Sequence, residues 1–110
     1  MEFHGVNVAT QFKRMRELVP ETYRAFLEFD KSAFKDGAIP GKMKELMALG
    51  IAQVTHCPWC IQAHTKKAAT AGASDAEIAE TTFVAMAMAA GAAWSHGGLV
   101  LQCLQEHKGA

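Results

Sequence analysis

The sequence lacks the signals of a β-sheet. No stretch alternates apolar and polar residues with a period of two, and valine and isoleucine are sparse beside alanine, leucine, methionine, glutamate and lysine. The pattern that remains is helical throughout. The sequence therefore predicts an all-α protein.

An excess of charge of either sign is also missing. Lysine and arginine together number 11, and aspartate and glutamate together also number 11. A protein that binds nucleic acid or an anionic membrane surface needs a basic surplus. We therefore expect neither nucleic acid nor membrane among the partners.

A targeting segment and a long apolar run are absent as well. Residues 1–12 show no basic stretch followed by an apolar core, which argues against a signal peptide. The longest apolar run, Phe83–Trp94, has 12 residues and contains Gly91. A span of the bilayer needs roughly 18. We expect a soluble, cytoplasmic protein.

The length of 110 residues indicates one domain over residues 1–110. Alanine accounts for 20 of these residues, and alanine buries little surface in a chain that already has a small core. Closely packed helices in a homo-oligomer are therefore favoured over a self-sufficient monomer.

Apolar residues at helical spacing, with prolines at starts and glycines at ends, predict about six helices. Gly91 is expected to mark either a break between the last two helices or a close helix crossing. The third and fifth helices are apolar enough to be buried. An aromatic stripe on the second helix, which includes Phe34, is interpreted as core or subunit interface. The predicted ranges are 8–18, 20 to the Asp36-Gly37 turn, 42–55, 58–72, 75–90 and 92–105.

The chemistry of the sequence is concentrated at Cys57-Pro58-Trp59-Cys60 and His64. Pro58 fits the first turn of a helix, and a helix start favours a thiolate because of its unpaired N–H groups and partial positive charge. At about 100° per residue, Cys57, Cys60 and His64 share one face. Two thiols and a base so placed are suited to peroxide reduction or thiol–disulfide exchange.

A zinc site is the competing interpretation of these residues. Cys57, Cys60 and His64 would supply three ligands, and a fourth would have to be His56, His96 or Cys103. The spacing favours none of these, and a second Cys or His pair is missing. We therefore expect no metal and no other cofactor.

Together with Glu45, twelve positions before Cys57, the Cys57–Thr65 segment and the Ala/Gly-rich stretch around Gly91 resemble the carboxymuconolactone decarboxylase-like proteins of the alkylhydroperoxidase D type. The resemblance covers roughly residues 20–100. It implies an all-helical subunit that assembles into homotrimers or homohexamers.

The resemblance also implies roles for the site residues. Cys60 matches the cysteine that attacks the peroxide, and Cys57 matches the partner that then forms the disulfide. His64 matches the relay base, and Glu45 matches an acid that works with it through water. Helix geometry alone favours Cys57, at the N-cap, as the more reactive thiol, so the order of the two cysteines stays open.

Four further residues are candidates for a place in or around the site. Trp59 stands where the alkylhydroperoxidase D type carries a histidine; it cannot relay protons, and we expect it to shape a pocket wall. His56 and His96 are second-rank pocket candidates, with an exposed loop and an interface or surface position as their ordinary interpretations. Cys103 lies on an apolar face and is expected to be a buried small hydrophobe.

The sequence thus predicts a cytoplasmic antioxidant enzyme, a thiol-dependent peroxidase or disulfide reductase. Its partners would be a hydroperoxide and an external dithiol donor of the thioredoxin or lipoyl type. Two alternatives are a cofactor-free decarboxylase or lactone-processing enzyme on the same fold, and a non-catalytic protein in which the cysteine pair is a redox switch.

Overall fold

The computed structural model describes residues 2–109, which form five helices and no strand. The helices are α1 (Val8–Leu18), α2 (Pro20–Phe34), α3 (Gly41–Val54), α4 (Pro58–Thr70) and α5 (Asp75–His107). The all-α prediction is confirmed. The first four helices agree with their predicted ranges to within two residues at each end.

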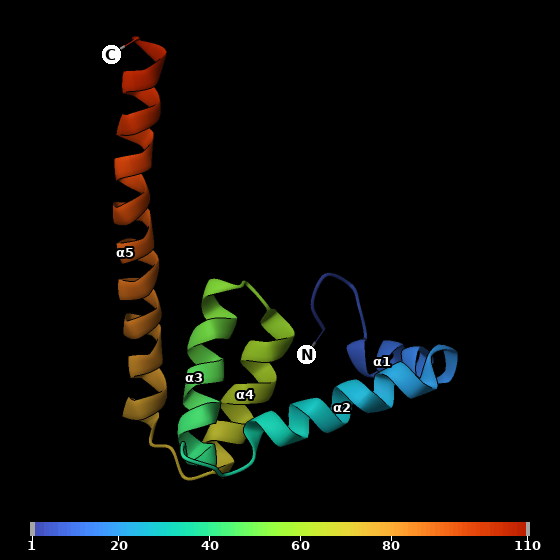
Figure 1. The fold of residues 1–110 in the computed structure, drawn as a ribbon. Coiled ribbons are helices and arrows are strands. Elements are labelled where there is room, and N and C mark those ends of the chain that lie inside the picture. The colour runs from blue at the N-terminus through green and yellow to red at the C-terminus, as the bar shows by residue number, and fades with distance from the viewer. Residues whose placement is uncertain (1, 110) are drawn as a thin grey trace.

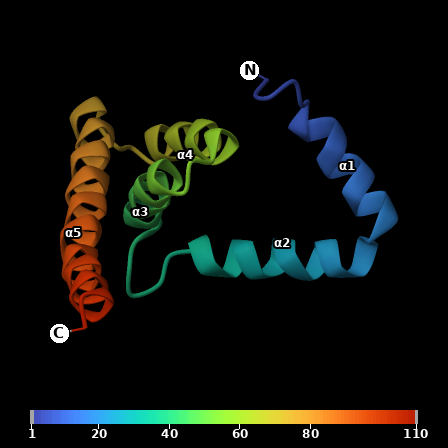
Figure 2. The same cartoon turned by 90° about the horizontal axis from the view of Figure 1, so that it is seen from above.

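Helices α3 and α4 form an antiparallel hairpin at the centre of the molecule, and α5 packs along α3 (Figure 1). On the other side, α1 and α2 form a bent arm, residues 8–34, that leaves the hairpin and turns back (Figure 2). The N-terminal segment returns toward α4. The hairpin thus has helices on both sides.

Local sequence signals account for most helix ends. Asn7 caps α1 by accepting a hydrogen bond from the backbone N–H of Thr10. Pro20 and Pro58 open α2 and α4, where the missing N–H costs nothing. Gly72 ends α4 at a φ of +93°, and the backbone N–H of Ala73 reaches back to the carbonyl of Ala68.

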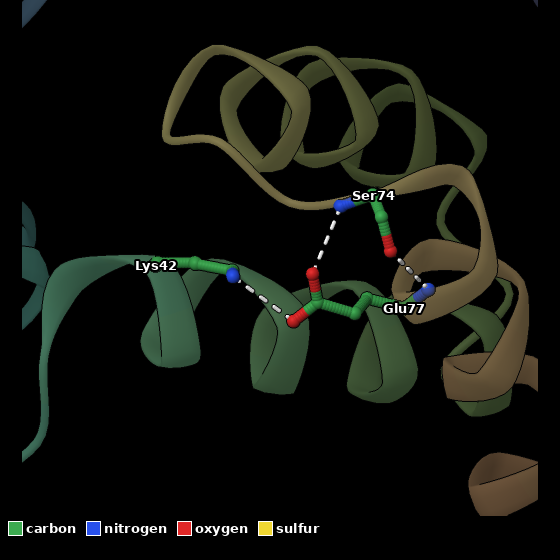
Figure 3. Close-up of polar contacts among 3 residues, drawn as sticks. All are labelled: Lys42, Ser74 and Glu77. Atoms are coloured by element: carbon green, nitrogen blue, oxygen red, sulfur yellow. Dashed lines mark hydrogen bonds and ion pairs between the residues drawn. The ribbon is translucent and has the colours of Figure 1, made fainter.

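The start of α5 is fixed by a reciprocal pair of hydrogen bonds (Figure 3). The backbone N–H of Glu77 donates to the hydroxyl of Ser74, and the backbone N–H of Ser74 donates to the carboxylate of Glu77. Lys42, at the start of α3, lies 3.0 Å from the same carboxylate. These contacts, the backbone bond first, lower the pKa of Glu77 below 4.5.

The expected break at Gly91 is wrong, because α5 continues through it as a single helix of 33 residues. A glycine inside a helix costs only about 1 kcal/mol relative to alanine. Its neighbours are mostly alanines, and no proline follows it in the sequence. The site where its Cβ would stand is also open, so no close helix crossing within the chain requires the glycine.

The expected burial of the third and fifth helices is wrong for the single chain. Within residues 2–109 only Leu49, Ala52, Ala68, Thr81 and Ala85 are buried. Cys103, expected to be buried, is exposed. The chain exposes 8588 Å², whereas a compact monomer of this mass exposes about 6,000 Å². Its radius of gyration is 18.8 Å, against about 13 Å for a compact domain.

Within the described chain, α5 is long and apolar enough to cross a membrane, since an 18-residue window has a mean hydropathy of 1.4. The longest uninterrupted apolar run has only 12 residues, so the sequence did not predict a membrane-spanning window here. The 18-residue window is longer because it also includes small polar side chains. Only 6% of that window is buried within the described chain.

Candidate functional site

Cys57 and Cys60 lie where the α3–α4 hairpin turns. Cys57 is the N-cap of α4, and the two cysteines form a disulfide with their Cα atoms 5.3 Å apart. The Cys57 sulfur also accepts the backbone N–H of Cys60 at 3.2 Å. The predicted placement of both thiols at a helix start is therefore observed, and here they are oxidised.

The turn before the pair is short because His56 adopts a left-handed backbone conformation, with a φ of +57°. This conformation lets the backbone N–H of Cys57 bond to the carbonyl of Ala52, one turn back in α3. His56 occupies the position just after the helix C-cap, where many helices have a glycine in the left-handed conformation. Its side chain is exposed, which agrees with its ordinary interpretation as a loop histidine.

His64 and Glu45 meet across the hairpin. The Nδ1 atom of His64 lies 2.6 Å from Oε2 of Glu45, and both side chains are mostly buried, at 16% and 13% exposure. The contact is direct, whereas the resemblance implied one through water. With Nδ1 bonded to the carboxylate, Nε2 is the ring nitrogen left for another partner.

Phe34 holds the same histidine from a third element. Its ring stacks on the His64 ring with centroids 5.1 Å apart and an angle of 19° between the planes. Sequence reasoning assigned Phe34 to the core or an interface, and no local signal relates it to a histidine 30 positions away. The stack and the Glu45 bond together fix the ring in plane and orientation.

Trp59, between the two cysteines, is covered by the N-terminal segment. Phe3 meets its ring edge-on at 6.2 Å, and His4 lies 5.7 Å from it. The turn that carries them has His4 and Gly5 at positive φ and closes through a bond from the N–H of Val6 to the carbonyl of Phe3. The indole N–H is buried without a partner in residues 2–109.

The structure does not bring His96 to this site. It lies on the exposed second half of α5, and its Nδ1 contacts the carbonyl of Ala92, one turn earlier. Cys103 lies farther along the same helix. Within residues 2–109, no group of three His, Cys, Asp or Glu side chains is arranged to hold a metal ion.

The assembled site therefore joins a redox pair to an acid–base pair. Cys60 and His64 are one helical turn apart on α4, and Glu45 and Phe34 come from α3 and α2. A disulfide can cycle with a dithiol, and a carboxylate-bound imidazole can take up and return a proton. The disulfide and His64 belong to α4 and its N-cap, and Glu45 reaches His64 from α3.

Known proteins share this fold and much of the sequence. The chain is 45% identical over 86 residues to a Paracoccus denitrificans protein called uncharacterized protein 4 in cox locus, which covers 78% of each chain. It is 34% identical to a carboxymuconolactone decarboxylase family protein from Legionella pneumophila, whose crystal structure matches with a TM-score of 0.71 over 74% of this chain and 73% of that one.

A crystal structure of a protein from Methanobacterium thermoautotrophicum matches with a TM-score of 0.72 and 26% identity, over 76% of this chain and 94% of that one. The model of the carboxymuconolactone decarboxylase family matches residues 20–102. This range contains all four residues of the disulfide and the Glu45–His64 pair. The chain belongs to the carboxymuconolactone decarboxylase family.

Proposed function

We propose that this protein is a thiol-dependent peroxidase or disulfide reductase that uses the Cys57–Cys60 pair. The observation that carries the proposal is the disulfide at the start of α4, one turn before the His64–Glu45 pair. A structural disulfide has no need of a buried acid–base pair beside it. The family includes enzymes, and this site has the groups for redox chemistry.

The proposed cycle begins with the reduced pair. The Cys60 thiolate attacks one oxygen of a hydroperoxide, the O–O bond breaks, and the alcohol leaves with one proton, which forms a sulfenic acid on Cys60. The Cys57 thiol attacks that sulfur, which forms the disulfide and releases water. An external dithiol then reduces the disulfide and is itself oxidised, so that one hydroperoxide and one dithiol yield an alcohol, water and a disulfide.

His64 and Glu45 manage the protons in this scheme. Glu45 accepts the Nδ1–H of the ring, which leaves Nε2 as the basic nitrogen. That nitrogen takes the proton of the attacking thiol and returns it to the departing alcohol or water. Glu45 stabilises the ring while it is charged, in the way a carboxylate supports a catalytic histidine elsewhere.

A cofactor-free decarboxylase or lactone-processing enzyme is the second candidate. The family's description and the direct Glu45–His64 bond favour it, because an acid–base pair suffices for that reaction. It would have no use for two thiols. Its signature is turnover of a carboxymuconolactone-type substrate that survives loss of both cysteines.

One set of assays separates these functions. Hydrogen peroxide, an organic hydroperoxide and a protein disulfide are offered in parallel, with dihydrolipoamide or thioredoxin as the dithiol donor. We expect steady consumption of at least one of them. Oxidation of the pair without turnover would indicate a redox switch, and no reaction with any of them would overturn the proposal.

We further propose that the protein works as a soluble cytoplasmic homo-oligomer, a trimer or hexamer. The chain exposes about 2,600 Å² more than a compact monomer of its mass, and a standard interface buries about 800 Å² per partner. An apolar groove of about 670 Å³ between α3 and α5, lined by Met43, Met47, Ile51 and Met88 among others, has no occupant within the described chain.

The second half of α5 is the segment we assign to that groove in another copy. It carries Trp94, Leu99, Val100, Leu101 and Leu104, all exposed. Light scattering on protein prepared without detergent should give a mass of three or six chains. A monodisperse monomer, or recovery only in the membrane fraction, would contradict this assembly.

A further inference from the structure

An open pocket of about 790 Å³ adjoins the His64–Glu45 pair on the side away from the disulfide. It lies where the end of α2, the start of α3 and the second half of α4 meet. Phe34 and Glu45 form part of its wall, so it shares two side chains with the site already described. A molecule in this pocket would contact Phe34 and Glu45, the two side chains that hold the ring of His64.

Some charged side chains of the pocket have hydrogen-bond or ion-pair partners, and others have none. Its carboxylates have partners, since Asp36 accepts the backbone N–H of Gly41 and Glu45 bonds to His64. Of its three lysines, Lys42 pairs with Glu77. Lys66 and Lys67 have no ion-pair partner within residues 2–109. The pocket therefore contains two ammonium groups without an ion-pair partner, together with the carboxylate of Asp36, whose hydrogen bond to a backbone N–H leaves its charge in place.

Helix geometry relates one of these lysines, Lys67, to the Cys60 sulfur, whereas Lys66 lies about 120° from Cys60 around α4. Lys67 follows Cys60 by seven positions and His64 by three. At about 100° per residue, Cys60 and Lys67 lie within about 20° of each other around α4. At 1.5 Å per residue they are about 10 Å apart along its axis. One extended molecule along this stripe passes His64 on its way from Lys67 to Cys60.

We infer that this pocket binds the anionic end of the substrate, and that the preferred substrate is an organic hydroperoxide with a carboxylate about 10 Å from its O–O bond. The inference rests on the proposed peroxidase function. Lys66 and Lys67 hold the carboxylate, and Phe34 and Ala63 offer apolar surface to the chain between its two ends. The hydroperoxide then lies at Cys60.

The test compares two substrates that differ only in charge. A medium-chain fatty acid with a hydroperoxide at its far end and the methyl ester of the same molecule are assayed with the intact protein. We expect kcat/KM to favour the acid. The double variant Lys66→Gln/Lys67→Gln should lower the ratio of acid to ester by about fivefold, mainly through KM, as expected for an exposed ion pair.

Lys13→Gln, on the exposed face of α1, is the matched control and should keep the wild-type ratio. Binding of decanoate, which cannot react, gives a readout without turnover through the amide chemical shifts of Thr70 and its neighbours. If no hydroperoxide is consumed but decanoate still binds more weakly to the double variant, the pocket stands and the peroxidase proposal fails. Equal binding to wild type and double variant would overturn the inference.

Discussion

The α3–α4 hairpin and the second half of α5 are both rich in apolar residues, but they differ in how many of their side chains are buried within the chain. The hairpin has neighbours on both sides and contains three of the buried side chains, Leu49, Ala52 and Ala68. The second half of α5 contains none. The residues of the candidate site are thus brought together within one chain, whereas the apolar side chains at the end of α5 have no cover within residues 2–109.

Length explains the difference. With 33 residues α5 extends about 50 Å, whereas α3 with 14 extends about 21 Å. The start of α5 is tied to α3 by the Lys42–Glu77 ion pair and by the hydrogen bonds of Gln53 with Thr81 and Thr82, so its second half must project past the hairpin (Figure 1). The long dimension of the molecule, 56 Å, reflects this projection.

The largest expected effect is on peroxide turnover, and it distinguishes the cysteine of the hairpin from the cysteine of α5. Cys60→Ser should lower peroxide turnover by about a thousandfold or more, because a hydroxyl at neutral pH is a far weaker nucleophile than a thiolate. Cys103→Ser, on α5, is the matched control and should keep full activity. Trapping of the sulfenic acid in Cys57→Ser identifies Cys60 as the attacking sulfur. Trapping it only in Cys60→Ser would reverse the two roles.

The next effect tests the acid–base pair in the hairpin. Glu45→Gln should lower kcat by about 100-fold, at the lower end of what a positioned acid–base group contributes. The amide still accepts a hydrogen bond from Nδ1 but does not stabilise the charged ring. The pH dependence of kcat should change with it. Glu28→Gln, an exposed glutamate on α2, should leave both the rate and the profile unchanged.

A third change moves to α5. Leu101→Glu places a charge on a side chain that is 66% exposed in the single chain and buried in the proposed assembly. Loss of about 2 kcal/mol at such a position raises the dissociation constant about 30-fold. Sedimentation velocity at falling concentration measures it. Gln105→Glu adds the same charge one turn later at a polar position, and equal dissociation of both variants would contradict the assigned interface.

A smaller effect is expected where the arm meets the hairpin. Phe34→Leu removes the ring stacked on His64 and should lower kcat by about tenfold, since the imidazole then loses one of its two restraints. Phe34→Tyr keeps the stack and should restore the rate. If Leu and Tyr variants have the same activity and the same pH profile, Phe34 only fills space and does not position the histidine.

The sequence predicted features that depend on local signals. The prolines at residues 20 and 58, the Ser74–Glu77 box and Gly72 each satisfy backbone groups within a few residues. The common face of the cysteines and His64 follows from helix geometry alone. The pairing of Glu45 with His64 came from the family resemblance, because nothing in the spacing fixes how two helices pack.

Other features depend on contacts between distant segments. The stack of Phe34 on His64 and the cover of Phe3 over Trp59 have no sequence signature. The continuity of α5 through Gly91 depends on many favourable neighbours outweighing one unfavourable residue. Burial of the third and fifth helices was predicted from their apolar composition, which does not indicate whether the same chain or another molecule covers them; within the described chain they are largely exposed.

The smallest expected effect concerns the link that aims α5 along α3. The backbone N–H of Ser74 and the ammonium of Lys42 hold the pKa of Glu77 below 4.5. Ionisation of the Glu77 carboxyl group therefore stabilises the folded state. This stabilisation is complete above pH 4.5 and is lost as the pH falls through the folded-state pKa. Glu77→Gln should therefore lower the unfolding midpoint slightly at pH 7 and by less in acid. Glu80→Gln, one turn on and exposed, should show no such pH dependence, and a Glu77→Gln effect that persists undiminished at pH 3 would mean that its charge is not what aligns the two helices.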